Sequence, residues 1–226
     1  MKKILMVCYG GGHVKIIAPL YQSLNAVYDI TILALTTAGA YLKERNIPYT
    51  SFADYKELLN DNILKYGVDL QEKLPSGIVD VDETVAYLGL SFNELIDAVG
   101  SYNVAKDLLE TKGRSIFLPL KTLIHIVNCI EPDLVITTNV ARAELAALHA
   151  AKELNIPSIC INDNLWIEGG AKNVACNGLC SVLCVLSKEV KDDILKKTNF
   201  SADNIKITGT PVFDIIKSLT KNKIKN

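Results

Sequence analysis

Short apolar runs alternate with longer amphipathic segments along most of this chain. The apolar runs have the length and composition of buried strands, and the segments between them repeat apolar residues at steps of three and four, as helices do. Strands are expected at residues 4–8, 30–35, 49–52, 134–137, 158–161, 179–186 and 205–207. Strands that alternate with helices predict an α/β fold with a doubly wound parallel sheet, similar to a Rossmann fold.

The middle of the chain departs from this alternation. Between about residues 54 and 130 the pattern is helical throughout, with helices expected at residues 55–66, 80–99, 101–111 and 115–129. Lys112-Gly113-Arg114 separates the last two. We therefore expect a helix-rich insertion in the middle of the Rossmann-like sheet.

The length, charge and hydrophobic content of the chain argue against several classes of protein. The chain has 226 residues, a formal net charge of −1 and 49% hydrophobic residues, enough to bury the core of one large domain. Near-neutral charge argues against nucleic acid as a partner. No apolar run has the length of a membrane span, and Lys2-Lys3 leads directly into the first strand instead of a signal peptide. We expect a cytoplasmic protein.

The cysteines suggest a metal site at first, but their spacing does not support one. Cys176, Cys180 and Cys184 are four residues apart, which matches no standard zinc or iron–sulfur pattern. The other three, which lie in apolar runs and are expected to be core residues, are Cys8, Cys129 and Cys160. We expect free thiols, no bound metal and no cofactor.

A triple-glycine turn is the strongest candidate for a binding site. Gly10, Gly11 and Gly12 join the first strand to the first helix and precede His13. Glycine allows positive φ and a close approach of the backbone to a ligand, and the helix N-terminus favours anions. The helix dipole is expected to lower the pKa of His13. The alternative is a tight turn with no ligand.

Two common phosphate-binding motifs are excluded at this turn. A Walker loop would end in Gly-Lys-Ser or Gly-Lys-Thr, which the turn lacks. A dinucleotide fingerprint would have a third spaced glycine near Lys15 and an acidic residue after the second strand, where Thr36 and Thr37 stand instead. NAD is therefore not an expected cofactor.

Other polar residues follow the later strands. In an open parallel sheet, ligands bind beyond the carboxyl ends of the strands, so these residues are expected to share an edge with the glycine turn. Each one alone is more often a helix cap or a turn former. Asp163 is a candidate for catalysis, and Ser187 is expected to cap a helix. The candidates for substrate binding are Gly10, Gly11, Gly12, Asn139, Arg142, Asn164, Gly209 and Thr210.

The order of these motifs resembles a known superfamily. Gly10-Gly11-Gly12-His13 resembles the glycine-rich loop of the lipid-II-forming N-acetylglucosaminyltransferases. Residues 132–158 resemble the second half of the acceptor-side domain in the same superfamily. Residues 187–214 are similar to the interdomain crossing of GT-B glycosyltransferases and UDP-N-acetylglucosamine 2-epimerases. The resemblance spans nearly the whole chain, and helix content alone carries it in the middle third.

The resemblance implies a two-domain enzyme of which this chain supplies one domain. In such enzymes the second Rossmann-like domain holds most of the nucleotide-sugar donor. Residues 1–212 are then expected to form a single acceptor-side domain, and residues 213–226 a basic tail or the start of the crossing to a second domain. A donor-binding domain or subunit is the expected partner, and the chain alone is expected to be folded but inactive.

The leading functional hypothesis is the acceptor-binding half of a glycosyltransferase for cell-surface or capsular polysaccharide. The acceptor would be a sugar or a lipid-linked sugar, and the nucleotide sugar would be a substrate. A base must act on the acceptor hydroxyl, and the leaving diphosphate needs stabilisation. His13 is the candidate for either role, and Asp163 is the rival base.

Two alternatives remain. The first is 2-epimerisation of UDP-N-acetylglucosamine, for which Asp163 and Glu168 are the available acid and base. The second is a non-catalytic binding subunit that docks on the inner face of a membrane through residues 114–121. The simpler interpretation of that segment is a helix start, with Pro119 in the first turn and the apolar side chains in the core.

Overall fold

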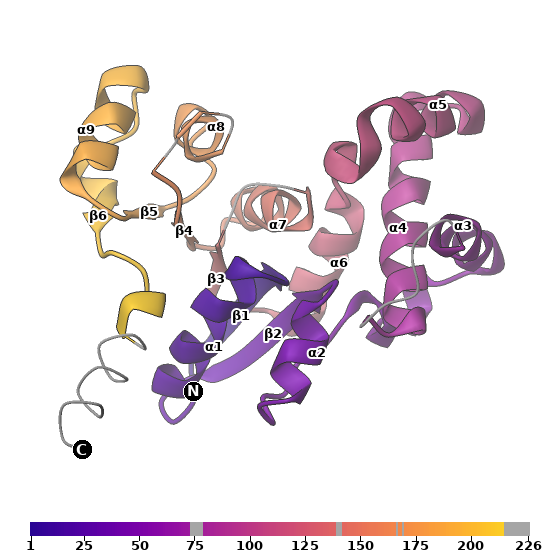
Figure 1. Ribbon diagram of the computed structural model, residues 1–226, viewed down its shortest axis with the longest axis horizontal. Helices are drawn as coiled ribbons and strands as arrows, with labels where there is room; N and C mark the ends of the chain where they lie inside the picture. The colour runs from indigo at the N-terminus through magenta and orange to yellow at the C-terminus, as the bar shows by residue number, and fades with distance from the viewer. Residues whose placement is uncertain (73–78, 139–141, 166, 169, 215–226) are drawn as a thin grey trace, which may run out of the picture.

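The centre of the protein is a six-stranded parallel sheet (Figure 1). The computed structural model describes residues 1–72, 79–138, 142–165, 167–168 and 170–214. The strand order is β2-β1-β3-β4-β5-β6, and every pairing is parallel. The strands are β1 (Lys3–Tyr9), β2 (Asp29–Leu35), β3 (Leu134–Thr137), β4 (Ser158–Ile161), β5 (Val182–Val185) and β6 (Ile205–Ile207). The predicted Rossmann-like α/β fold is confirmed.

The strand order indicates where along the sheet a ligand is expected to bind. β1 pairs with β2 on one side and with β3 on the other, so the chain changes direction across the sheet between β1 and β3. The loops that leave these two strands diverge at such a switch point and leave a crevice beyond the strand ends. The triple-glycine turn follows β1, and Thr138 follows β3. The two loops therefore lie side by side, and His13 contacts Thr138.

Helices cover both faces of β1, because successive side chains of a strand point to opposite faces. On one face Ile4, Met6 and Cys8 share a core with α1 (Gly12–Leu24) and α2 (Ala38–Lys43). On the other face Leu5, Val7 and Tyr9 share a core with α6 (Leu120–Ile130) and α7 (Arg142–Glu153). Five alanines of α7 are buried in that layer, and such small side chains allow the helix to lie close to the sheet: Ala143, Ala146, Ala147, Ala150 and Ala151.

The predicted helix-rich insertion is present at one side of the sheet (Figure 1). It contains α3 (Asp61–Gln71), α4 (Val81–Val99) and α5 (Tyr102–Lys112). Glycines let α3 and α4 touch backbone to backbone. A Cβ at Gly67 would lie 2.1 Å from the carbonyl oxygen of Val85, and one at Gly89 would lie 2.1 Å from that of Ile63.

Two predicted elements before α3 are different in the structure. The expected strand at 49–52 is reduced to a bridge between Thr50 and Leu33, because Ser51 and Asp54 form a capping box that starts η1 (Phe52–Asp54). The expected helix at 55–66 is split into η2 (Lys56–Leu58) and α3. The break falls at Asn60, whose side chain accepts a hydrogen bond from the Ile63 N–H at 3.0 Å and starts a new helix.

The segment before α6 also differs from the prediction. Residues expected to begin a helix at 115 form η3 (Gly113–Ile116), and Pro119 is the N-cap of α6. The helix-start interpretation of residues 114–121 is confirmed for Phe117, which is buried in the core. It is wrong for Pro119, which precedes the first turn of α6, and for Leu118, which is 38% exposed.

The second half differs from the prediction in α8 (Ala171–Cys176), a helix that the pattern did not predict. The strand expected at 179–186 is shortened to β5. The chain then continues through α9 (Lys188–Lys197) and η4 (Ala202–Asn204) to β6. Ser187 caps α9 as predicted, accepting a hydrogen bond from the Val190 N–H. Residues 215–226 lie outside the described part of the chain, so the expected boundary at 212 stays a prediction.

The cysteine prediction is wrong for the burial of one residue. All six cysteines are free thiols, and Cys8 and Cys160 are buried as expected. Cys129 is exposed instead of buried, because it lies on the outer face of α6 while Ile126 and Val127 of the same helix face the core. Within the described ranges no helix combines the length and apolarity of a membrane span.

Candidate functional site

Two positions of the triple-glycine turn do not accommodate a larger residue without a clash or backbone strain. A Cβ at Gly10 would lie 1.7 Å from Thr37 Oγ1, so only glycine fits against the loop that follows β2. Gly11 has φ 72° and ψ −127°, a combination that L side chains rarely adopt. Gly12 then opens α1, whose N-terminus has no side-chain cap and no acidic residue in its first turn. The turn therefore brings backbone N–H groups to the sheet edge.

His13 is held at this edge by the loop after β3. Its Nδ1 lies 2.9 Å from Thr138 Oγ1 and 3.1 Å from Glu144 Oε1. The His13 side chain is 24% exposed, whereas that of Glu144 is fully buried. The imidazole thus spans from a buried carboxylate to the surface, across the switch point of the sheet.

Glu144 is the buried anchor of the site. Its carboxylate accepts hydrogen bonds from the N–H groups of Tyr9 at 3.2 Å and Thr138 at 2.7 Å, and from the Thr138 hydroxyl at 3.0 Å. A carboxylate buried in the core is stable only when donors surround it in this way. Glu144 is not among the site residues that the sequence predicts. The available signal was a glutamate on the otherwise alanine-rich, buried face of that helix.

These hydrogen bonds determine which ring nitrogen of the neutral His13 side chain carries the proton. The single proton of the Thr138 hydroxyl is donated to Glu144 Oε2, so Thr138 Oγ1 can only accept from the imidazole. The carboxylate oxygen is also an acceptor. Both partners therefore favour the proton on Nδ1, and the lone pair of Nε2 is directed away from Glu144.

The pKa of His13 is raised, whereas the sequence predicted a lowered pKa. Burial lowers the pKa of His13, but the hydrogen bond and the negative charge of Glu144, together with the charge of Asp163, outweigh it and raise the pKa above its usual 6.5. The positive charge of Arg142 opposes them in part. The expected lowering of the pKa is wrong, because Glu144 and Asp163 together favour the protonated ring.

Arg142 and Tyr9 complete one wall of the site. The Arg142 guanidinium lies over the Tyr9 ring, 4.3 Å from its centroid, which is a cation–π contact. Arg142 has φ 54°, an uncommon left-handed conformation for an arginine. The Tyr9 hydroxyl accepts a hydrogen bond from the Ala143 N–H at 3.1 Å and contacts the Tyr87 hydroxyl at 3.2 Å. Burial raises the pKa of Tyr9 well above its usual value.

The loop after β4 supplies the second carboxylate. Asp163 Oδ2 lies 3.7 Å from the place of a Cβ on Gly12, so the predicted pair of Asp163 and the glycine turn is brought together. Asn164 is exposed next to it, and its carbonyl accepts a hydrogen bond from the buried Asn162 at 2.8 Å. Asn139, a further candidate, lies outside the described residues. Glu168 is exposed on the surface and pairs with Lys172 and Lys197.

Gly209 and Thr210 lie at a separate hollow. They line a cavity of about 400 Å³ together with apolar residues of α1 and of one face of the sheet, among them Leu20, Leu24 and Ile159. None of the described residues that line this hollow belongs to the His13 site. The structure therefore gathers His13, Asp163, Arg142 and the glycine turn at one place, and puts residues 209–210 at another.

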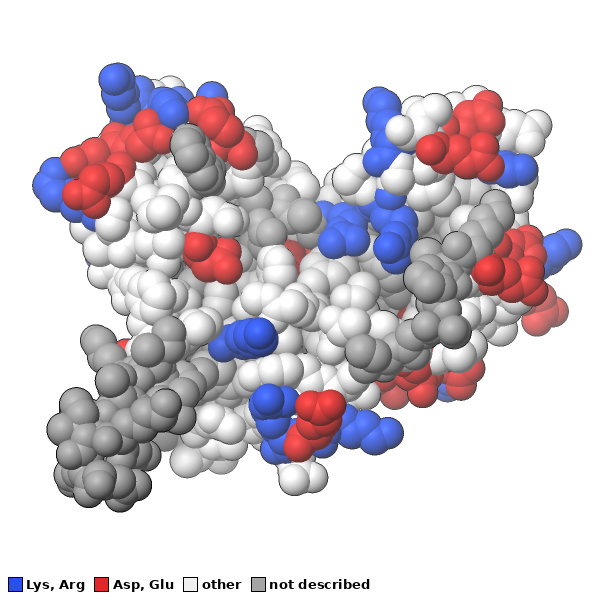
Figure 2. Space-filling view, viewed as in Figure 1, with Lys and Arg blue, Asp and Glu red and all other residues white. Residues whose placement is uncertain are grey.

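The molecular surface is indented on the face shown in Figure 2. The indentation lies between the part that contains α8 and α9 and the part that contains α4 and α5 (Figures 1 and 2). Basic side chains lie on the α5 side of this indentation.

The comparisons with known proteins bear on the fold. No family model and no curated protein matches the chain. Solved structures do match. A UDP-GlcNAc 2-epimerase from Neisseria meningitidis bound to UDP-GlcNAc has a TM-score of 0.55 at 16% identity, covering 98% of this chain and 50% of that one. The UDP-N-acetylglucosamine 2-epimerase of Rickettsia bellii has a TM-score of 0.56 at 10% identity, covering 100% and 49%.

These matches show a shared fold. The chain spans about half the length of the solved structures that it resembles, 47% of the Methanocaldococcus jannaschii UDP-GlcNAc 2-epimerase for example, at 13% identity and a TM-score of 0.54. The likeness therefore shows that this chain shares the fold of about half of each of these structures.

Proposed function

We propose that this chain is the acceptor-binding half of a nucleotide-sugar-dependent glycosyltransferase, acting in cell-surface or capsular polysaccharide biosynthesis. The observation that supports it is the His13–Glu144 pair, held beside a triple-glycine turn at the switch point of the sheet. A buried carboxylate on one imidazole nitrogen and a partly exposed ring form the arrangement that general bases use. The acceptor is a sugar or lipid-linked sugar, and a donor-binding domain or subunit supplies the nucleotide sugar.

In this proposal His13 Nε2 removes the proton from the acceptor hydroxyl as its oxygen attacks the anomeric carbon. Glu144 stabilises the imidazolium that forms and acts as a positioning residue. The N–H groups of the glycine turn and the first turn of α1 bind the diphosphate that leaves. The raised pKa of His13 also makes the imidazole a stronger base once it has lost its proton.

Epimerisation of a UDP-linked sugar is the second candidate, and a specific observation favours it. Asp163 lies near Gly12 and its charge acts on His13, which gives the site two titratable groups. Removal and return of a proton at a sugar carbon needs two such groups. The solved structures described above are UDP-GlcNAc 2-epimerases by name. Glu168, in contrast, is paired on the surface and is not part of this proposal.

The first test asks whether a nucleotide sugar or an amino sugar reaches His13. The chain has three histidines, so few imidazole proton signals occur in its NMR spectrum, and His13→Gln assigns one of them. We expect UDP-GlcNAc or N-acetylglucosamine to shift the His13 signal and to leave that of His149, on α7, unchanged. If neither compound shifts the His13 signal at millimolar concentration, the proposal is wrong.

Turnover then separates the two reactions. The chain, with a donor-binding subunit where one is identified, is incubated with UDP-GlcNAc and acceptors in deuterium oxide. Sugar transfer without deuterium at C2 supports the transferase, and deuterium at C2 of the nucleotide sugar supports the epimerase. In either case His13→Ala should lower turnover about 10²- to 10⁴-fold, and a near-normal rate would remove His13 from the mechanism.

A further inference from the structure

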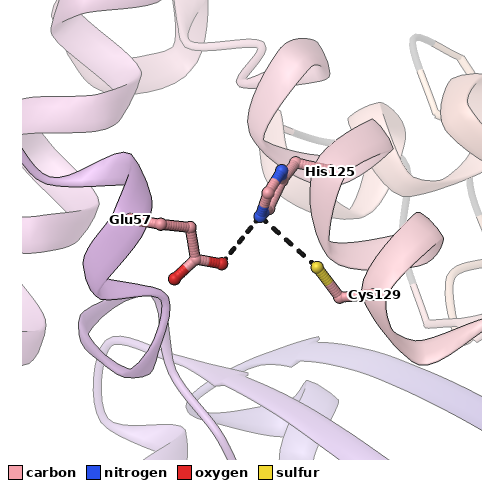
Figure 3. A group of neighbouring side chains, drawn as sticks. All are labelled: Glu57, His125 and Cys129. Carbon is pink, nitrogen blue, oxygen red and sulfur yellow. Dashed lines mark hydrogen bonds and ion pairs between the residues drawn. The ribbon is translucent and has the colours of Figure 1, made fainter.

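A second cluster of chemically active side chains lies outside the His13 site. Glu57 of η2, and His125 and Cys129 of α6, point toward one another (Figure 3). His125 Nε2 lies 2.7 Å from Glu57 Oε1 and 3.4 Å from Cys129 Sγ. Each residue offers one ligand atom, and these three atoms lie within 4.8 Å of one another. Across the described ranges this is the one group of three or more such residues close enough to share a metal ion.

The contacts do not form a proton relay. A relay of the Cys–His–carboxylate kind uses both imidazole nitrogens, with the thiol at one and the carboxylate at the other. Here the thiol and the carboxylate both approach Nε2. One nitrogen carries a single proton, so it cannot pass a proton from the thiol to the carboxylate. Three donor atoms that converge on one point are instead the geometry of a coordination site.

We propose that Glu57, His125 and Cys129 bind a thiophilic divalent cation, with Zn²⁺ as the preferred ion. The donor set combines one sulfur, one nitrogen and one oxygen, which Zn²⁺ accepts in tetrahedral sites. Mg²⁺ and Ca²⁺ prefer all-oxygen ligands and are not expected to bind. Water fills the fourth position, because the Glu57 side chain is 55% exposed and that of His125 is 35% exposed.

The local structure favours this ligand set. His125 and Cys129 are four residues apart on α6 and therefore lie on the same face of the helix. The Tyr55 ring packs edge-on against His125, with ring centroids 6.5 Å apart, and so restrains the imidazole. Donor atoms around Zn²⁺ are about 3.3–3.6 Å apart. The S–N separation of 3.4 Å already fits, and the exposed Glu57 side chain can open its shorter contact.

Binding would tie η2 to α6 and so stabilise the folded chain. The Cys129 thiol releases its proton to the buffer as the thiolate binds the metal, and the imidazole binds in its neutral form with the proton on Nδ1. The cluster shares no residue with the His13 site, so this proposal does not depend on the proposed function. Its consequence is a metal-dependent increase in thermal stability.

Cobalt provides the direct test. Untagged protein is reduced, freed of metal with a chelator and titrated with Co²⁺. We expect the near-ultraviolet thiolate-to-cobalt charge-transfer band in the wild type and in Cys176→Ser, which removes another exposed cysteine. The band should be absent from Cys129→Ser. Added Zn²⁺ should abolish the band by competition, and His125→Ala should raise the dissociation constant for Zn²⁺ at least about 10- to 100-fold.

Controls distinguish a loss of metal binding from a loss of folding. Circular dichroism and thermal unfolding of the metal-free variants establish that each one folds, and Zn²⁺ should raise the melting temperature of the wild type and of Cys176→Ser only. No band in the wild type, a band that persists in Cys129→Ser, or equal Zn²⁺ affinity in all variants would overturn the proposal.

Discussion

At the scale of single residues, the protein places one charged side chain where few charges are tolerated. Glu144 is fully buried, yet two N–H groups, one hydroxyl and the His13 ring surround its carboxylate. Each donor lowers the cost of burying the charge, and the charge in turn fixes the proton on the imidazole. The sequence offered both residues, but nothing in their spacing of 131 positions indicated that they meet.

The first prediction concerns Glu144→Gln. Removing the charge should lower the pKa of His13, since burial then acts with less opposition. An NMR titration of the His13 signal measures this shift, and His149, whose pKa burial and Lys152 already lower, should titrate as in the wild type. A simple structural role for Glu144 would leave the pKa of His13 unchanged, which would contradict the prediction.

The same substitution has a consequence for stability against pH. The folded-state pKa of His13 lies above its unfolded value of 6.5, so protonation contributes stability below pH 6.5 that is lost as the pH rises through the folded-state pKa. Urea unfolding as a function of pH should therefore show a larger difference between wild type and Glu144→Gln just below pH 6.5 than on the alkaline side.

The second prediction uses two glycines of the same turn. Gly10→Ala would place a Cβ 1.7 Å from Thr37 Oγ1 and 3.0 Å from its backbone carbon, so the free energy of unfolding should fall by about 1–3 kcal/mol. Gly12→Ala is the matched control. Its Cβ meets Asp163 at 3.7 Å, an ordinary contact, and the change should stay within about 0.5 kcal/mol. Equal losses in urea unfolding would contradict this account.

At the scale of elements, capping interactions set the residue at which a helix begins. Periodicity predicted one helix at 115–129, but α6 begins only at Leu120, because Glu94 of α4 caps it from outside. The Glu94 carboxylate accepts hydrogen bonds from the N–H groups of Lys121 and Thr122, both at 2.8 Å, and from the Thr122 hydroxyl at 2.6 Å. Pro119, the N-cap residue, provides no side-chain cap of its own. A cap supplied by another helix leaves no local signal in the sequence.

The third prediction follows from this cap. Glu94→Ala should lower the free energy of unfolding by about 1–2 kcal/mol, the cost of an uncapped helix N-terminus. Glu110→Ala, at an exposed position of α5, removes the same side chain without uncapping a helix and should change it little. Chemical denaturation measures both variants. A loss for Glu94→Ala no greater than for Glu110→Ala would show that the cap contributes nothing to stability.

At the scale of the whole molecule, the sheet brings distant segments together. β1 lies between β2 and β3, although more than a hundred residues separate β1 from β3 in the sequence. That arrangement sets the loop after β1 against the loop after β3, and so places His13 against Thr138. Residues 209–210, in contrast, line another hollow beside Leu20 and Leu24 of α1. Being at the carboxyl end of a strand was thus insufficient to place a residue in the His13 site.

The sequence by itself determined the fold class, the helical insertion, the glycine turn and most strands, because these depend on local periodicity and on steric limits of individual residues. Only the tertiary structure decided that Glu144 is buried against His13, that the imidazole pKa is raised, and that Cys129 faces outward beside His125 and Glu57. Those properties depend on which side chains meet across the sheet and between helices. Hydrogen bonds and charges act over a few ångströms in space, whatever the separation along the chain.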